Sequence, residues 1–127
     1  MSEGPSVVDV LIVDDQPPFR SIARAVVETV GGWRVTAEAA SGEDALVQAA
    51  RVQPALVLMD INLPGLSGIE TTRLLLDAEP GTTVVLMSTY AADDLPPGAG
   101  DCGAAAYLRK EDLTPVALRA LAAARHC

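Results

Sequence analysis

Cysteine is scarce in this chain, and its two cysteines do not form a metal-binding or disulfide pattern. Cys102 and Cys127 make no CxxC motif, so neither a zinc site nor a disulfide framework is indicated, and both are interpreted as incidental thiols. Long hydrophobic stretches are also absent, because no apolar run approaches the ~20 residues that a membrane span requires. The N-terminal residues show no secretory signal pattern. These features predict a soluble, cytoplasmic protein without a membrane segment.

An excess of positive charge is missing as well. Nine basic side chains stand against seventeen acidic ones, which leaves a formal net charge of −8. Direct binding to a nucleic-acid backbone would need a basic face, so the chain is not expected to bind nucleic acid by itself. A length of 127 residues fits one compact core, and residues 1–127 are therefore predicted to form a single domain.

What the sequence does contain is a series of short apolar runs that are rich in β-branched residues. The runs are nearly continuous in their apolar character, which is typical of strands that are covered on both faces of a parallel sheet. The predicted strands span residues 7–13, 34–39, 55–59, 83–87 and 104–108.

Helix start and stop signals fill most of the gaps between these runs. Pro17-Pro18 begins the first predicted helix and Gly31-Gly32 ends it. Each of the other predicted helices has a serine or threonine in the N-cap position. These caps are Ser41 with Asp44, Ser67 with Glu70, and Thr114 before Pro115.

The segment between the fourth and fifth strands, residues 93–103, lacks a helical pattern. Pro96, Pro97, Gly98 and Gly100 lie in its middle, and an interior proline costs a helix about 3 kcal/mol and each glycine about 1 kcal/mol. A loop or at most one short turn is predicted there. Alternating strands and helices predict an α/β fold with a doubly wound parallel sheet, and right-handed crossovers restrict its topology to a few possibilities. Among these we choose a flavodoxin-like sheet of five parallel strands in the order 2-1-3-4-5, with the fourth helix short or absent.

Polar side chains follow four of the five predicted strands. Asp14-Asp15 follows the first, Asp60 the third, Ser88 the fourth and Lys110 the fifth. The carboxyl ends of parallel strands meet at one edge of the sheet, where ligands bind. Three neighbouring carboxylates repel one another by about 4 kcal/mol per close pair at an intermediate dielectric, so this edge needs a cation. Carboxylates that leave room for waters and phosphate oxygens favour Mg²⁺.

This combination of groups suits phosphoryl transfer. One carboxylate is free to attack, a metal ion and an ammonium can neutralise phosphoryl oxygens, and a hydroxyl can donate a hydrogen bond. Asp60 is the candidate nucleophile, with Ser88 and Lys110 as the supporting catalytic residues. Lys110 is the only lysine in the chain, and its compact point charge fits a tight phosphoryl site better than an arginine fork would.

Four blocks of the sequence together resemble the signatures of response regulator receiver domains. They are VLIVDDQPPFR, LVLMDINLPGLSGIE, VVLMSTY and AAAYLRKEDL. They stand in the family's order and spacing and cover about residues 7–125. The flanking residues are most similar to receivers that precede a LuxR-type output domain. The resemblance implies a two-component signalling protein, not a turnover enzyme, that is phosphorylated by a histidine kinase.

The resemblance also implies a Mg²⁺ site and a phosphoacceptor. Asp15 and Asp60 would ligate the metal directly, Asp14 would act through water, and the backbone carbonyl of Asn62 would complete the set. Asp60 would accept the phosphoryl group.

Two further residues would form the switch of the family. Ser88 would follow the phosphoryl group by hydrogen bonding, and Tyr107 would report the phosphorylated state through its rotamer, while Lys110 would form an ion pair with the group. Thr89 is bulkier than the residue often found at its position, which predicts reduced access to the site. The Pro-Pro-Gly segment replaces a helix that the family commonly uses for dimers or partner docking. Whether this chain signals its phosphorylated state through that surface is therefore in question.

Three other functions remain alternatives. A Mg²⁺-dependent phosphohydrolase would want an acid/base aspartate two residues after the nucleophile, where this chain has Asn62. A pseudo-receiver would keep the fold and signal without phosphate. A flavin-binding protein would need a Ser/Thr/Gly-rich loop where Pro17 and Pro18 stand. The output domain or partner protein, and whether a weak homodimer forms, stay open.

Overall fold

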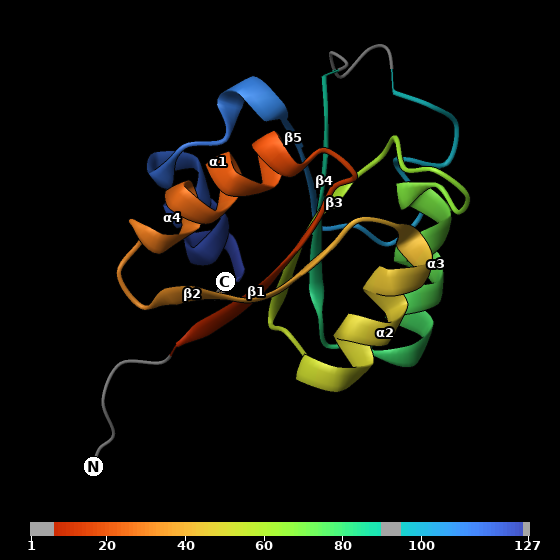
Figure 1. The fold of residues 1–127 in the computed structure, drawn as a ribbon, viewed down its shortest axis with the longest axis horizontal. Coiled ribbons are helices and arrows are strands. Elements are labelled where there is room, and N and C mark those ends of the chain that lie inside the picture. The colour runs from red at the N-terminus through yellow and green to blue at the C-terminus, as the bar shows by residue number, and fades with distance from the viewer. Residues whose placement is uncertain (1–6, 90–94, 126–127) are drawn as a thin grey trace.

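The structure, a computed structural model, describes residues 7–89 and 95–125. Strands and helices alternate along the chain as far as the fourth strand (Figure 1). The strands are β1 (Val8–Val13), β2 (Trp33–Ala39), β3 (Leu56–Asp60), β4 (Thr83–Ser88) and β5 (Ala106–Arg109). The helices are α1 (Pro17–Glu28), α2 (Gly42–Val52), α3 (Gly68–Ala78), the short 3-10 helix η2 (Lys110–Asp112) and α4 (Pro115–Arg125).

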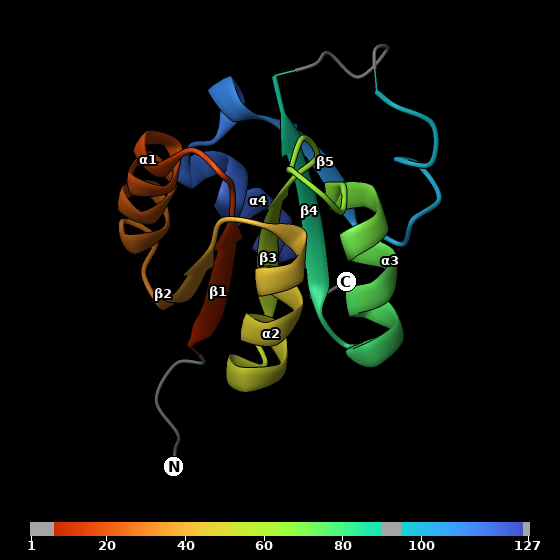
Figure 2. The same cartoon turned by 45° about the vertical axis from the view of Figure 1, so that its right-hand side comes forward.

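The five strands form one parallel sheet in the order β2-β1-β3-β4-β5. This order confirms the predicted flavodoxin-like α/β fold. Helices α1 and α4 cover one face of the sheet, and α2 and α3 cover the other (Figures 1 and 2). Every residue of the central strand β3 is buried, which explains why its sequence shows continuous apolarity instead of alternation.

Two hydrophobic clusters hold the helices against the sheet, one on each face. Successive residues of β1 alternate between them, because side chains of a strand point to opposite faces. Val10 and Ile12 belong to the cluster under α1 and α4, whereas Leu11 and Val13 belong to the cluster under α2 and α3. Trp33 is buried at the start of β2 in the first of these clusters, as an anchor for that strand.

The helices begin where the predicted caps lie. The Ser41 hydroxyl accepts a hydrogen bond from the Asp44 amide at 3.1 Å, and Ser67 and Thr114 cap α3 and α4 in the same way. Each cap satisfies a backbone donor that the first helical turn leaves without a partner. Helix α1 begins at Pro17 without a side-chain cap, which suits proline because it lacks the amide hydrogen.

The described residues between β4 and β5 are 89 and 95–105, and they contain no helix. Two turns shape this segment, with the amides of Ala99 and Asp101 donating to carbonyls three residues earlier. Gly98 and Gly103 adopt φ of 91° and 101°, a region that side chains disfavour. The predicted loop is confirmed over this part, while residues 93 and 94 of the prediction, like Cys127, lie outside the described residues.

The last strand starts two residues later than predicted. Residues 104 and 105 form no strand, although the Ala105 amide still donates to the Val84 carbonyl at 2.8 Å. The ladder with β4 begins with the pairing of Val85 and Ala106. In the part of the chain that the structure describes, no helix has the length and apolar character to cross a membrane.

Candidate functional site

Three carboxylates meet at the carboxyl edge of the sheet. Asp14 and Asp15 follow β1 directly, and Asp60 is the last residue of β3. One oxygen from each lies within 4.8 Å of the others. Asp14 is fully buried and Asp60 is 2% exposed, whereas Asp15 is exposed. The predicted convergence of these side chains is therefore observed, and it is the parallel pairing of β1 with β3 that brings them together.

Local hydrogen bonds fix the two buried carboxylates. The Gln16 amide donates to Asp14 Oδ1 at 2.8 Å, and the Asn62 amide donates to Asp60 Oδ1 at 3.1 Å. Both contacts are aspartate turns, in which a side chain accepts from the backbone two residues later. In addition, Arg20 Nη1 donates to the Asp14 carbonyl at 2.7 Å, which ties the first turn of α1 to this loop.

Lys110 brings the balancing positive charge from the end of β5. Its Nζ lies 2.7 Å from Asp14 Oδ2 and 3.4 Å from Asp60 Oδ2, and its side chain is only 13% exposed. The same Nζ lies 4.6 Å from the centroid of the Phe19 ring, within the range of a cation–π interaction. Phe19 was not among the site residues predicted from the sequence. Its position in the first turn of α1, four residues after Asp15, was the available signal.

At this edge of the sheet the pKa values of both Asp60 and Lys110 are raised above their ordinary values. Burial, followed by the negative charge of Asp14, raises the pKa of Asp60 to about 6, although Lys110 and the Asn62 amide oppose that rise. Burial lowers the pKa of Lys110, but its hydrogen bond to Asp14 and the charges of Asp60 and Asp14 outweigh burial and raise that pKa. Two buried carboxylates thus share one ammonium, and a second cation would be attracted to this edge.

The two predicted switch residues contact each other. Ser88, the fully buried last residue of β4, has its Oγ 3.1 Å from the Tyr107 Oη on β5. Ser88 pairs with Arg109 in the sheet, so it lies beside the residue that precedes Lys110. The sheet therefore brings the hydroxyl of Ser88 to the same edge as the carboxylates.

A hollow of about 190 Å³ opens over this edge. Its lining is polar and includes the exposed side chain of Asn62 as well as Thr89. Thr89 thus borders the hollow, as expected from the sequence. The full lining consists of Asp15, Gln16, Asp60, Asn62, Thr89 and Lys110.

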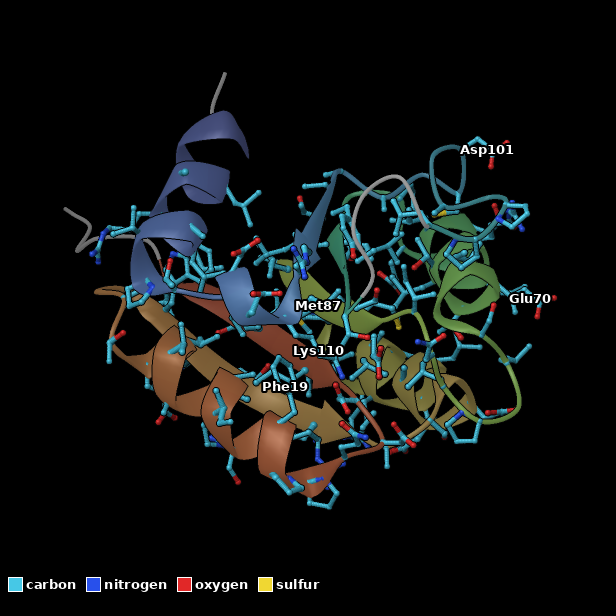
Figure 3. All side chains as sticks on the ribbon, turned by 90° about the horizontal axis from the view of Figure 1, so that it is seen from above. Phe19, Glu70, Met87, Asp101 and Lys110 are labelled. Carbon is cyan, nitrogen blue, oxygen red and sulfur yellow. The ribbon has the colours of Figure 1, made fainter. Side chains whose placement is uncertain are left out.

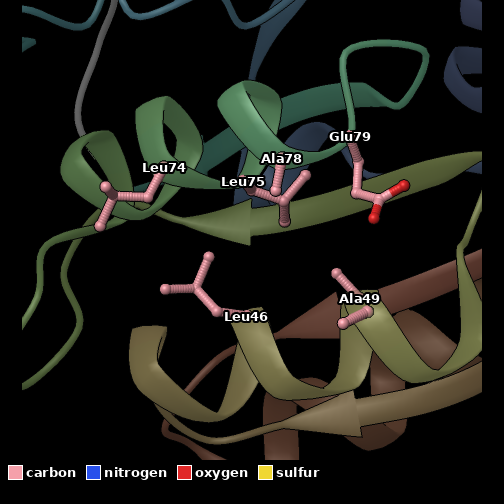
Figure 4. Close-up of a pocket in the computed structure, with 7 residues that line it drawn as sticks. Leu46, Ala49, Leu74, Leu75, Ala78 and Glu79 are labelled. Atoms are coloured by element: carbon pink, nitrogen blue, oxygen red, sulfur yellow. The ribbon is translucent and has the colours of Figure 1, made fainter.

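A second hollow, of about 240 Å³, is an apolar groove between α2 and α3. Leu46 and Ala49 of α2 lie across from Leu74 and Leu75 of α3, and Glu79 lies at one end (Figure 4). This groove offers apolar side chains and a single carboxylate, so it lacks the cluster of charged groups that borders the polar hollow.

Comparisons with known proteins agree with this geometry. Residues 10–122 match the family model described as response regulator receiver domain. The chain is 36% identical over 104 residues to the response regulator GacA of Pseudomonas protegens, covering 82% of this chain and 49% of that protein. It is 41% identical over 113 residues to the transcriptional activator protein ExaE of Pseudomonas putida, covering 88% and 52% respectively. The chain therefore spans about half the length of these curated relatives.

Solved structures give the same result. A LuxR-family response regulator from Aurantimonas sp. SI85-9A1 superposes with a TM-score of 0.86 at 28% identity, covering 95% of this chain and 86% of that one. The receiver domain of a response regulator, NarL, from Mycobacterium tuberculosis superposes with a TM-score of 0.80 at 28% identity, covering 91% and 97%. Sequence, fold and the acidic edge of the sheet agree, and the chain belongs to the family of response regulator receiver domains.

Proposed function

We propose that this chain is a phosphorylation switch in which Asp60 accepts a phosphoryl group from a histidine kinase in the presence of Mg²⁺. The observation that carries the proposal is the group of three carboxylate oxygens within 4.8 Å of one another, beside one ammonium and open to a polar hollow. A receiver domain is a signalling module and not a catalytic enzyme, so the phosphorylated state of the chain is the signal that a partner responds to.

The donor set suits a hard divalent ion. Carboxylate and carbonyl oxygens are the ligands that Mg²⁺ prefers, and Mg²⁺ typically keeps several waters and takes only one or two carboxylates. Asp15 and Asp60 would bind it directly, the buried Asp14 would act through water, and the Asn62 carbonyl would complete the protein ligands. Bound there, the ion would neutralise charge on the phosphoryl oxygens.

Asp60 is equipped to act as the nucleophile. With a pKa of about 6, its carboxylate is ionised near neutral pH. Its Oδ1 accepts from the Asn62 amide, and its Oδ2 faces Lys110. One carboxylate oxygen forms the new bond to phosphorus while the bond from phosphorus to the donor histidine nitrogen breaks, and the nitrogen leaves with the electron pair. Lys110 then pairs with the added negative charge.

The switch uses the contact between Ser88 and Tyr107. In the unphosphorylated chain their oxygens are 3.1 Å apart. A phosphoryl group on Asp60 adds three strong acceptor oxygens, and the Ser88 hydroxyl turns to donate to one of them. Tyr107 then loses that contact and changes its rotamer at the edge strand β5. A local charge change is converted in this way into a different surface for a partner.

We propose that a partner binds this surface differently in the two phosphorylation states. The curated relatives are about twice as long as this chain, so an output domain or a separate partner protein would respond to phosphorylation. We also propose that residues 1–127 form one domain, with a core of about 7–125, that acts in the cytoplasm. With a net charge of −8, it would not itself bind nucleic acid.

The test is the intact mass of the protein after incubation with acetyl phosphate and Mg²⁺. We expect a single acid-labile phosphoryl adduct that disappears with EDTA and in Asp60→Asn. Asp77→Asn is the matched control, because Asp77 is an exposed carboxylate on α3 and its loss should leave the adduct unchanged. If Asp60→Asn is modified as fully as the wild type, or if neither acetyl phosphate nor a phosphorylated histidine kinase modifies the wild type, the proposal is wrong. The second result would favour a phosphate-independent interaction module.

A further inference from the structure

The only phenylalanine and the only lysine of this chain lie in contact. Phe19 is in the first turn of α1 and Lys110 follows β5, yet the lysine Nζ lies 4.6 Å from the centroid of the phenylalanine ring. Figure 3 shows the two side chains next to each other at the carboxyl edge of the sheet. The face of an aromatic ring carries partial negative charge, and a cation within about 6 Å of the centroid is attracted to it.

The ring is held in place by the core. Phe19 is partly buried and packs against the hydrophobic cluster under α1 and α4. The Lys110 side chain is 13% exposed, so water has little access to the contact between them. Cation–π attraction is stronger when the partners are shielded from water, and this contact meets that condition.

The ring differs from the other partners of the ammonium in one respect. Asp14 Oδ2 and Asp60 Oδ2 contact Lys110 Nζ at 2.7 and 3.4 Å, and both belong to the carboxylates that a divalent ion would also attract. A metal ion at that edge would compete with the ammonium for these oxygens and repel it. The ring of Phe19 is not a ligand for a hard cation, so its attraction for the ammonium would persist.

We propose that Phe19 is a positioning residue that keeps the Lys110 ammonium beside Asp60 once a divalent cation occupies the carboxylates. The ammonium is then already in place to pair with the phosphoryl group when it arrives. Without the ring, the long lysine side chain would be free to turn toward solvent, and its ordering would oppose phosphoryl binding. This inference rests on the proposed role of Asp60 as phosphoacceptor.

The test changes the charge on the ring face and leaves the ring shape nearly unchanged. Because Phe19 is the only phenylalanine, growth on mono-, di- or trifluorophenylalanine alters this position alone. The first readout is affinity for beryllofluoride, an analogue of the phosphoryl group, in saturating Mg²⁺. We expect affinity to fall step by step with fluorination, by about fivefold for the trifluoro ring, which corresponds to about 1 kcal/mol. Phe19→Trp should bind at least as tightly as the wild type.

The second readout follows the lysine itself. Since Lys110 is the only lysine, a ¹³C-labelled lysine gives one ε-methylene NMR signal, which the ring current of Phe19 should displace. We expect that displacement to remain when Mg²⁺ is added and to vanish in Phe19→Leu. Lys110→Met is the matched control for effects of fluorination on packing. In this variant, fluorination should no longer affect the affinity for beryllofluoride.

The outcomes separate this inference from the proposed function. Equal beryllofluoride affinity across the fluorinated series, or a lysine signal that loses its displacement when Mg²⁺ binds, would overturn the role of Phe19 while leaving Asp60 as the acceptor. Failure of the unsubstituted protein to bind beryllofluoride in Mg²⁺ would overturn both. Graded loss of affinity in the wild type that is absent in Lys110→Met would establish the positioning role.

Discussion

Replacing Asp60 with asparagine should make the metal-free protein more stable. Asp60 is 2% exposed, close to the fully buried Asp14, and the two carboxylates share the Lys110 ammonium. The substitution removes one buried negative charge. The new amide oxygen can still accept from the Asn62 amide, which lies 3.1 Å from Oδ1 in the wild type.

The magnitude follows from the pKa of Asp60. Its pKa in the folded protein is about 6, compared with an ordinary value of 3.8, and this difference corresponds to about 3 kcal/mol that ionisation of Asp60 costs the fold. The attraction of Lys110 is already included in this pKa, but burying the new side-chain amide group costs free energy, which offsets part of the gain. We therefore expect Asp60→Asn to raise the free energy of unfolding by about 1–2 kcal/mol at pH 7.5 without divalent cations.

The sign of the pH dependence follows from proton binding. Between pH 3.8 and about 6 the folded state binds more protons at Asp60 than the unfolded state does. The contribution of Asp60 to stability therefore falls as pH rises through this window, and the cost is fully present above it. The advantage of Asp60→Asn should be largest at pH 7.5 and should shrink as the pH approaches 4.

The assay is urea denaturation in EDTA, with wild type and variant compared at each pH so that the titration of other groups cancels. Asp77→Asn, an exposed substitution on α3, is the control and should change stability by less than about 0.5 kcal/mol. If Asp60→Asn is no more stable than the wild type at pH 7.5, the reasoning from shared charge is refuted.

Two further predictions concern the close packing of α3 and the metal. A Cβ on Gly68 would lie 2.0 Å from the Asp60 carbonyl oxygen, so Gly68→Ala should lower the free energy of unfolding by about 2 kcal/mol or more in the same urea assay. Gly31→Ala is the control, because nothing lies within 4 Å of the added Cβ, and it should change the free energy of unfolding by less than about 0.5 kcal/mol. Mg²⁺ at 100 times its Kd should stabilise the wild type by about 2.7 kcal/mol in that assay, and EDTA should reverse the effect. An equal gain in Asp60→Asn would contradict a role for this carboxylate in binding the ion.

Much of the fold could be predicted because its signals are local. The caps at Ser41, Ser67 and Thr114 act within one helical turn, so the starts of α2, α3 and α4 were predictable from three or four residues each. Alternation and the handedness of crossovers left only a few possible strand orders, and the order chosen among them is the observed one. Once the strands were assigned, the meeting of Asp14 and Asp60 at one edge was a geometric consequence.

The side-chain pairings could not be predicted in the same way. That Lys110 Nζ lies nearer Asp14 than Asp60, at 2.7 against 3.4 Å, depends on where η2 turns after β5. The contact with Phe19 joins residues that are 91 positions apart, and no local pattern marks such a pair. The late start of β5 at Ala106 is likewise decided by pairing with β4 and not by the apolar run that begins earlier.

The helix-free segment 95–105 should tolerate the insertion of additional residues. Cys102 is buried in the cluster under α2 and α3, and Leu95 and Ala99 pack against that cluster, but no ladder of helical hydrogen bonds links these anchors. Gly100, between them, is exposed and has open space around it. Doubling the length of such a loop costs only about 0.6 kcal/mol, so an epitope or reporter peptide inserted at Gly100 would disturb the sheet and its acidic edge very little.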